Sequence, residues 1–316
     1  MDLQDKIKEA ERALRLAAEM SEYYYHKPLV VCYSGGKDSD VMLDIAKRCL
    51  SLNQFEVVNS HTTVDAPETV YHIRAVFKDL ESQGIKTTVK MPTYKGKPIS
   101  MWRLIEIKTM PPTRFTRYCC SVLKETTMPN RMIAIGVRED ESLARQGKDI
   151  FNTWHRNPDK SLHKTTGHTY AMFKLDQTGN DEAYECEYIK ACKAHKKTII
   201  NPIYRFTEAE VWQYIKTYDL TVNPLYAKGY KRVGCIGCPL GSPQSMTKEF
   251  LDNPKYKENY IKAFDRMIAN SRKRGTRVFL GDDTTGEDVM RWWLGENPKQ
   301  VRIDDILSEV TNDEQE

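Results

Sequence analysis

Two sets of residues in this 316-residue chain have the types and the spacing that chemistry requires. The first is the hexapeptide Ser34-Gly35-Gly36-Lys37-Asp38-Ser39, whose glycines, hydroxyls and lysine suit a phosphate group. The second is the adjacent pair Cys119 and Cys120, followed about 115 residues later by Cys235 and Cys238 in a CxxC arrangement. Thiolates with such spacing suit a metal ion, an iron–sulfur cluster or redox chemistry.

The hexapeptide lies between a predicted strand and a predicted helix. Leu29–Tyr33 is a short apolar run, and an amphipathic pattern begins at Asp38. A turn of this kind presents free backbone N–H groups and the positive end of the helix dipole to an anion. Lys37 adds a positive charge, and the Asp38 carboxylate suits Mg²⁺ held against a polyphosphate such as ATP. The alternative is an ordinary glycine turn capped by a serine or an aspartate.

Two further polar segments also follow predicted strands. In a parallel sheet, ligands bind beyond the carboxyl ends of the strands, so we expect both segments to face the ligand of the hexapeptide. The Arg138 guanidinium suits phosphate oxygens, and Glu141 is a candidate to hold it in position. The alternative to ligand binding is a surface loop for the segment at 136–142 and a helix start at Pro67 for the segment at 61–69. The candidate residues in these segments are Thr63, Asp65, Gly136, Arg138, Glu141 and Ser142.

The rest of the pattern alternates strands with helices. Residues 1–22 read as an amphipathic helix, Pro67 opens another, and Thr207 with Glu210 forms a capping box that starts a further helix. This alternation predicts an α/β fold: a Rossmann-like parallel sheet with helices on both faces, followed by a helical C-terminal tail. We expect strands at 29–33, 55–59, 87–89, 131–137 and 198–203.

We expect three parts along the chain: an N-terminal helix at 1–27, a nucleotide-binding domain at 28–242 and a helical region at 243–316. Residues 147–197 are predicted as an excursion from the sheet because they are polar and have little periodicity. The excursion contains Cys186, Cys192 and His195. These three are either polar residues of a loop or ligands of a second metal site, for which His163 or His168 is the candidate fourth ligand. Cys32 and Cys49 are expected in the core, since both fall on apolar faces.

Composition limits the classes of function. With 48 Lys plus Arg against 44 Asp plus Glu, the net charge is +4, too small for a protein that binds nucleic acid over its whole surface. No apolar stretch approaches the roughly 20 residues that span a membrane. The N-terminus lacks the pattern of a signal peptide. Eight cysteines in such a chain favour metal, cluster or redox chemistry over disulfides. We therefore expect a cytoplasmic protein with no membrane partner.

The order of the motifs resembles that of one known family. SGGKDS, TTVDAPET, RYCCSVLK, GVREDES and VNPLYAKGYKRVGCIGCP follow one another as in the phosphoadenosine-phosphosulfate (PAPS) reductase family of PP-loop ATP-pyrophosphatase-like proteins. The similarity runs from about residue 28 to about residue 240. It implies an adenine nucleotide α-hydrolase-like fold in which Ser34–Ser39 and Arg138 face a nucleotide. It also implies ATP cleavage to AMP and pyrophosphate, with Lys37, Asp38 and Arg138 in catalytic roles.

The four cysteines are compatible with more than one metal group. Side chains of adjacent cysteines diverge, so Cys119 and Cys120 cannot easily bind one small tetrahedral ion, whereas a larger cubane accepts them together with a CxxC pair. A zinc site and redox-active or structural thiols remain alternatives. The pattern is similar to the [4Fe–4S] site of adenylyl-sulfate reductases and DNA phosphorothioation enzymes. This resemblance implies that Cys119, Cys120, Cys235 and Cys238 are cluster ligands.

Two departures distinguish this chain from the sulfonucleotide reductases of that family. Those reductases carry a nucleophilic cysteine near the C-terminus, and here no cysteine follows Cys238. They also typically carry degenerate loops in place of SGGKDS. The resemblance therefore favours an ATP-dependent sulfur-transfer or nucleotide-modifying enzyme. The alternatives are a sulfonucleotide reductase that acts with an external thiol and a non-catalytic nucleotide-sensing module.

The expected partners follow from that function. They are a nucleotide, either ATP or a sulfonucleotide, and as further candidates a nucleic-acid substrate and a sulfur-donor protein such as a cysteine desulfurase. The acceptor, whether DNA, tRNA or a small molecule, is not defined by the sequence. A basic stretch with two tryptophans is a hypothetical nucleic-acid contact, the alternative being a solvated helix end with buried tryptophans. Its residues are Arg272, Lys273, Arg274, Arg277, Trp292 and Trp293.

Overall fold

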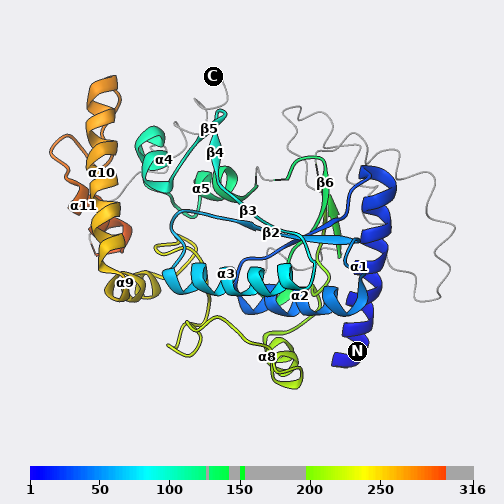
Figure 1. Ribbon diagram of the computed structural model, residues 1–316. Coiled ribbons are helices and arrows are strands. Elements are labelled where there is room, and N and C mark those ends of the chain that lie inside the picture. The colour runs from blue at the N-terminus through cyan, green and yellow to red at the C-terminus, as the bar shows by residue number, and fades with distance from the viewer. Residues whose placement is uncertain (126–127, 142–149, 154–196, 297–316) are drawn as a thin grey trace. The chain divides into compact units, whose positions relative to one another are not determined.

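The computed structural model describes residues 1–125, 128–141, 150–153 and 197–296, and Figure 1 shows the path of the chain. The chain forms two compact units. The sheet unit comprises Met1–Ser60, Pro67–Lys90 and Met128–Val233. The helical unit comprises His61–Ala66, Met91–Thr127 and Gly234–Glu316. Among the described residues, none of the helices combines the length and the apolar character of a membrane-spanning segment.

The sheet unit is built on a six-stranded sheet in the order β3-β2-β1-β6-β8-β7. Five strands run parallel, with Val31 of β1 beside Val57 of β2 on one side and Ala134 of β6 on the other, and β7 pairs antiparallel at the edge. The prediction of an α/β fold with a parallel sheet is therefore confirmed. The strands are β1 (Leu29–Cys32), β2 (Phe55–Ser60), β3 (Thr87–Lys90), β6 (Arg131–Ala134), β7 (Phe151–Thr153) and β8 (Lys197–Ile200).

Two strands end earlier than the apolar runs predicted. The run at 131–137 leaves the sheet after Ala134, and Gly136 then approaches the carbonyl of Asp38 so closely that a Cβ would lie 3.1 Å from it. The run at 198–203 leaves the sheet after Ile200, because Asn201 begins a turn that its carbonyl closes with the Tyr204 amide at 3.1 Å. Both early exits deliver polar residues to the carboxyl end of the sheet.

The helices of the sheet unit begin at clear N-terminal signals. In α1 (Leu3–Tyr25), the Asp2 side chain accepts from the Asp5 amide at 2.9 Å. In α8 (Glu208–Thr217), Thr207 and Glu210 form the predicted capping box. Helix α2 (Lys37–Cys49) follows β1, and α3 (Pro67–Ser82) follows β2 along the chain. Figure 1 shows α2 and α3 on the same side of strands β1, β2 and β3.

Strand side chains alternate between two apolar clusters. Leu29, Val31 and Val57 belong to the main cluster, which also contains buried residues of α1, α2, α3 and α8. Val30 and Val58 belong to a smaller cluster on the opposite face. This period of two is what a pleated strand requires when both faces are covered. Cys49 and Cys32 are half-buried and pack against the two clusters respectively, as predicted.

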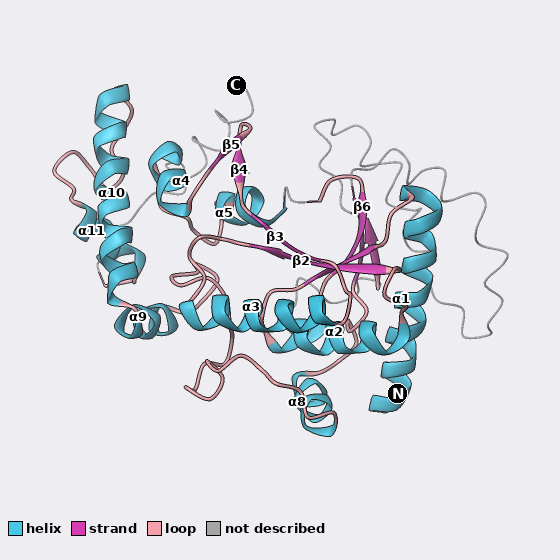
Figure 2. Cartoon of the chain, in the orientation of Figure 1, coloured by secondary structure: helices cyan, strands magenta, loops and turns pink. Residues whose placement is uncertain are grey.

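The helical unit contains several elements that the sequence pattern did not indicate. They are the hairpin of β4 (Thr93–Tyr94) with β5 (Lys97–Pro98), and two short helices, α4 (Met101–Lys108) and α5 (Tyr118–Cys120). A π-helix at Ser121–Glu125 continues α5. The predicted helical C-terminal region is present as α9 (Pro243–Asp252), α10 (Pro254–Arg274) and α11 (Gly286–Trp293). Figure 2 shows the helices of this unit in cyan, joined by loops in pink, and the short hairpin in magenta.

Aromatic side chains form the centre of the helical unit. Tyr260 of α10 is fully buried and packs against Trp102, Phe250 and Trp293. The Trp293 indole N–H donates to the Pro112 carbonyl at 2.7 Å. Trp293 is therefore a core residue, and the hypothesis that it contacts nucleic acid is wrong, because its ring and its N–H are both used inside the unit.

Candidate functional site

The hexapeptide forms a tight turn between β1 and α2. The Ser39 hydroxyl closes it by donating to the Gly36 carbonyl at 2.7 Å and accepting from the Gly36 amide at 3.1 Å. The same oxygen accepts from the Ser34 amide at 3.3 Å and lies 3.2 Å from the Ser34 hydroxyl. Gly36 is the N-cap of α2, so the amides of Lys37 and Asp38 fall at the positive end of the helix. The predicted strand–turn–helix context is confirmed.

Gly35 is required by both conformation and space. Its φ of 72° lies in the left-handed region that side chains disfavour. A Cβ at this position would lie 2.9 Å from Cγ1 of Ile73 and 3.2 Å from Cγ2 of Thr69, both on α3. The turn is therefore pressed against α3, and any larger residue would push it away.

A distant segment of the sheet unit also holds the turn. The buried Asn223 amide donates to the Gly35 carbonyl and to the Thr69 hydroxyl, each at 3.0 Å. The Tyr226 hydroxyl accepts from the Lys37 amide at 2.9 Å. Sequence reasoning missed both residues, although they lie within the quoted motif VNPLYAKGYKRVGCIGCP. The Asn-Pro pair and the tyrosine there were the available signals.

Arg138 reaches the same turn from the segment after β6. Its Nε donates to Oδ1 of Asp38 at 2.6 Å, and its Nη1 donates to Asp140 at 2.5 Å. The guanidinium is almost completely buried. Lys37 Nζ lies 3.6 Å from Asp38 and 3.6 Å from Glu208. The structure thus brings Lys37, Asp38 and Arg138 together, as the sequence predicted, with two unpredicted carboxylates beside them.

Two further predicted residues, Glu141 and Ser142, follow Arg138 along the chain. Glu141 ends a short 3₁₀ helix at Glu139–Glu141 and is exposed. Ser142 lies outside the described residues. The same holds for the predicted excursion and its candidate second metal site, Cys186, Cys192 and His195 with His163 or His168.

Thr63 and Asp65 belong to the helical unit rather than to the sheet unit. Thr63 has a φ of 67°, which is rare for a β-branched residue, and its hydroxyl accepts from the Met101 amide at 2.9 Å. Asp65 Oδ2 accepts from the Thr62 amide at 2.9 Å and lies 3.4 Å from His61 Nδ1. Burial opposes ionisation of Asp65, but His61, Lys124 and Thr62 outweigh it and lower its pKa. Asp65 is therefore a carboxylate.

The four predicted cysteine ligands all lie in the helical unit. Cys119 and Cys120 end α5, immediately before the π-helix, an element frequent at functional sites. Cys235 forms an isolated antiparallel bridge with Asp65 and approaches the Thr62 hydroxyl at 3.4 Å. All four thiols are free of disulfides, and they are buried or half-buried.

The surroundings of these cysteines favour a thiolate at Cys120 and oppose one at Cys119 and Cys235. A hydrogen bond from Cys119 lowers the pKa of Cys120, with further help from Arg117 and Lys124, and the same bond raises the pKa of Cys119. Burial raises the pKa of Cys235, which Lys124 counteracts. Cys235 in turn is the main cause of the raised pKa of Lys124, although much of the lysine side chain is exposed. The cysteines and Lys124 therefore form one electrostatic group.

Gly237 lets the CxxC segment pack closely against the aromatic core. Its φ is 70°, and a Cβ there would lie 2.6 Å from Cζ of Phe250 and 3.1 Å from Cη2 of Trp293. Its amide donates to Glu249 at 2.8 Å, and Tyr260 donates to the Ile236 carbonyl at 2.9 Å. These contacts fix the backbone between Cys235 and Cys238.

The four cysteines form a donor set made of thiols alone. In the described part of the chain, no three or more His, Cys, Asp or Glu side chains are grouped closely enough to hold a metal ion. The chemistry of the set is nevertheless that of a soft-metal site, because four thiols interact electrostatically and cations accompany them. The four cysteines therefore fit an iron–sulfur cluster by donor type and by charge.

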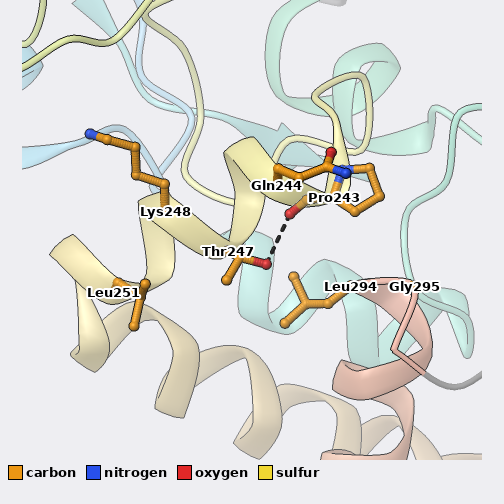
Figure 3. A pocket seen from close by; sticks show the side chains of 7 residues that line it. All are labelled: Pro243, Gln244, Thr247, Lys248, Leu251, Leu294 and Gly295. Carbon is orange, nitrogen blue, oxygen red and sulfur yellow. Dashed lines mark hydrogen bonds between the residues drawn. The ribbon is translucent and has the colours of Figure 1, made fainter.

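A pocket in the helical unit is lined by α9 and by residues that follow α11 (Figure 3). Within it, the Thr247 hydroxyl donates to the Pro243 carbonyl at 2.9 Å, and Leu251 is largely exposed. None of the predicted site residues is among the residues that line it. The turn in the sheet unit and the cysteines in the helical unit are therefore two separate candidate sites, and this pocket belongs to neither.

Residues 28–241 match the phosphoadenosine phosphosulfate reductase domain. An uncharacterised protein of Methanocaldococcus jannaschii is 26% identical over 266 residues, covering 84% of this chain and 46% of that protein. The adenosine 5'-phosphosulfate reductase of Shouchella clausii is 36% identical over 116 residues, covering 31% of this chain and 44% of that enzyme. The chain thus spans less than half the length of these relatives.

Solved structures give more distant similarities. The phosphoadenylyl-sulfate reductase of Candida auris has a TM-score of 0.41 at 15% identity, covering 72% of this chain and 93% of that chain. The U34-tRNA thiolase NcsA of Methanococcus maripaludis, solved with its [4Fe-4S] cluster, has a TM-score of 0.38 at 16% identity, covering 85% of this chain and 80% of that chain.

Proposed function

The chain belongs to the family of phosphoadenosine phosphosulfate reductase domains, and from this premise we propose that it is an ATP-cleaving enzyme that activates an acceptor for sulfur transfer. In this proposal Ser34–Ser39 bind ATP with Mg²⁺, and Cys119, Cys120, Cys235 and Cys238 hold a [4Fe–4S] cluster. The observation that carries it is the intact turn at the start of α2, with Lys37, Asp38 and Arg138 gathered around it.

The geometry of the turn supports phosphate binding. Ser39 fixes the backbone, so the amides at the start of α2 are preorganised for an anion and lose little freedom when it binds. Lys37 and the buried Arg138 provide positive charge where negative charge develops on the phosphates. The Asp38 carboxylate suits Mg²⁺, an ion that prefers oxygen ligands.

The proposed reaction transfers AMP before sulfur. An acceptor oxygen attacks the α-phosphorus of ATP, and the bond from that phosphorus to the oxygen bridging to the β-phosphate breaks. Pyrophosphate leaves, and the acceptor carries AMP. A donor of the hydrosulfide class then displaces AMP together with the acceptor oxygen, so sulfur replaces oxygen without net oxidation or reduction.

The cysteines fit a cluster for reasons of charge as well as type. A bound [4Fe–4S] cluster would supply electron transfer or an iron site for sulfur. Lys124 and Arg117 offset the negative charge of the thiolates, and Gly237 lets the CxxC segment pack without a clash. Asp65 belongs to the same electrostatic group and lowers the net positive charge of the surroundings.

A second candidate is a sulfonucleotide reductase acting with an external thiol. It is favoured by relatives named adenosine 5'-phosphosulfate reductase, such as that of Shouchella clausii. Under either function we propose that a nucleotide is the small-molecule partner. A nucleic-acid acceptor, a sulfur-donor protein, a cytoplasmic location and domain limits at 1–27, 28–242 and 243–316 also remain proposals.

The two functions differ in products. Protein purified without oxygen is incubated with Mg·ATP, hydrosulfide and either DNA or tRNA, and separately with a sulfonucleotide and a thiol. Release of pyrophosphate that depends on the acceptor supports the sulfur-transfer proposal. Sulfite release from the sulfonucleotide, with no cleavage of ATP under any condition, would replace it with the reductase.

A further inference from the structure

The first amide of α2 is already occupied by a side chain of the protein. The Tyr226 hydroxyl accepts from the Lys37 amide at 2.9 Å. This amide is one of the donors that a helix N-terminus offers to a phosphate. The same hydroxyl would lie 3.5 Å from a Cβ at Gly36, so it sits directly over the turn.

The charged groups of the turn are likewise engaged by the protein's own acceptors. Lys37 Nζ lies between Asp38 and Glu208, at 3.6 Å from each. Arg138 donates to Asp38 and to Asp140. In the described structure, oxygens of the protein itself therefore contact the donor groups of the turn that a polyphosphate would contact.

We propose that the Tyr226 hydroxyl holds the place of a phosphate oxygen, and that a nucleotide polyphosphate binds by displacing it from the Lys37 amide. The inference rests on the proposed function of the turn and adds a residue that sets its affinity. In the free protein, the Tyr226 hydroxyl gives the Lys37 amide a hydrogen-bond acceptor. Because the phosphate must displace this hydroxyl, Tyr226 lowers the affinity for the nucleotide.

The surroundings of Tyr226 allow its side chain to leave while the backbone stays. Asn223 anchors the base of its turn on the Gly35 carbonyl, and the Tyr226 amide closes that turn on the Asn223 carbonyl at 3.1 Å. The ring packs edge-on against the partly exposed Trp212, with centroids 5.2 Å apart. Lys37 Nζ lies 5.6 Å from the ring centroid. A rotation of the side chain therefore changes the environment of Trp212.

Tyr226→Phe removes the competing hydroxyl and keeps the ring. Titration calorimetry with Mg·ATP, and separately with inorganic pyrophosphate, should give a Kd about 3- to 10-fold lower than that of the wild type, the range expected for one neutral hydrogen bond. The matched control, Tyr71→Phe on the exposed face of α3, should leave the Kd unchanged. Unfolding temperatures recorded in parallel separate tighter binding from a change in fold.

If the Tyr226 hydroxyl has a structural role, Tyr226→Phe should raise the Kd for Mg·ATP instead of lowering it. If the hydroxyl only supports the turn, or contacts the bound phosphate, Tyr226→Phe binds ATP more weakly, and the inference is overturned while ATP binding by the wild type still stands. If neither protein binds ATP or pyrophosphate, the proposed function falls and the inference falls with it. The two failures are thus distinguishable.

Fluorescence of the wild-type protein gives a second readout that needs no Tyr226 variant. Addition of pyrophosphate should change tryptophan emission, and Trp212→Phe should abolish that change without abolishing binding. Binding by the wild type with no emission change that depends on Trp212 would show that the ring stays in place, which contradicts displacement.

Discussion

The side-chain amide of Asn223 donates to the carbonyl of Gly35 across 188 positions of sequence, at 3.0 Å. Asn223 is completely buried and also donates to the Thr69 hydroxyl. One side chain therefore joins the glycine turn, the helix α3 and the segment that carries Tyr226. This link explains how a turn with two glycines keeps one conformation.

Asn223→Ala should destabilise the sheet unit and weaken nucleotide binding together. The change leaves the buried Gly35 carbonyl and the Thr69 hydroxyl without this donor, which costs about 1–3 kcal/mol of unfolding free energy. Denaturant unfolding measures the loss, and calorimetry with Mg·ATP measures the binding. The control is Asn53→Ala at an exposed position, where both quantities should stay at the wild-type values. A stable Asn223→Ala protein with unchanged affinity would show that the turn does not need this link.

Arg138→Lys should not replace arginine in the proposed reaction. The guanidinium contacts Asp38 through Nε and Asp140 through Nη1, a fork that one ammonium cannot reproduce. We expect release of pyrophosphate to fall by about 10²–10³-fold, the range seen when a transition-state donor is removed. Arg74→Gln, at an exposed position on α3, serves as the control. If Arg138→Lys keeps its activity within a few-fold of the wild type, the positive charge of Arg138 matters and its two-pronged hydrogen bonding does not.

Gly237→Ala should lower the stability of the helical unit more than Gly275→Ala does. Both glycines have a positive φ, of 70° and 67°, so both substitutions carry a conformational cost of about 1 kcal/mol or more. Only Gly237 has a close neighbour, Phe250 at 2.6 Å from the added carbon. The difference between the two variants in thermal unfolding therefore measures the packing of the CxxC segment. Equal losses would mean that Phe250 moves aside without cost.

Cys119→Ser and Cys238→Ser should each lose iron and acid-labile sulfide. The two thiols come from separate segments of the helical unit, so each variant tests a different pair of the proposed ligand set. Cys49→Ser, half-buried in the sheet unit, is the matched control and should keep the metal content of the wild type. Iron and sulfide are measured per chain after purification without oxygen. Stoichiometric zinc in a colourless wild-type protein would contradict the cluster.

The elements that the sequence predicted best are those that depend on residues close together along the chain. The apolar run before Ser34, the glycines and the helical pattern after Asp38 are sufficient to define β1, the turn and α2. The capping box at Thr207 similarly defines the start of α8. Each of these elements depends on residues within a few positions of one another. Pattern and capping rules therefore apply to them directly.

Contacts between distant segments could not be predicted in the same way. The Asn-Pro pair at Asn223 indicates a local turn, but no neighbouring residue indicates that Asn223 or Tyr226 contacts the glycine turn, because their partners lie almost 190 positions away. Thr63 and Asp65 follow β2 along the chain and were expected at the rim of the sheet, but the chain leaves the sheet unit after Ser60. For Trp293, the sequence leaves a nucleic-acid contact and a buried position as alternatives, and the structure confirms the buried one, in which Phe250 and Tyr260 pack against its ring.

The central claim is that the turn at the start of α2 cleaves ATP between its α- and β-phosphates. ATP labelled at the α-phosphorus is incubated with Mg²⁺, hydrosulfide, an acceptor mixture of DNA and tRNA, and the protein purified without oxygen. We predict labelled AMP, free or joined to an acceptor, in amounts equal to the pyrophosphate released, and neither product with Lys37→Ala. Labelled ADP with inorganic phosphate, or sulfite from a sulfonucleotide with the ATP left intact, would contradict the account.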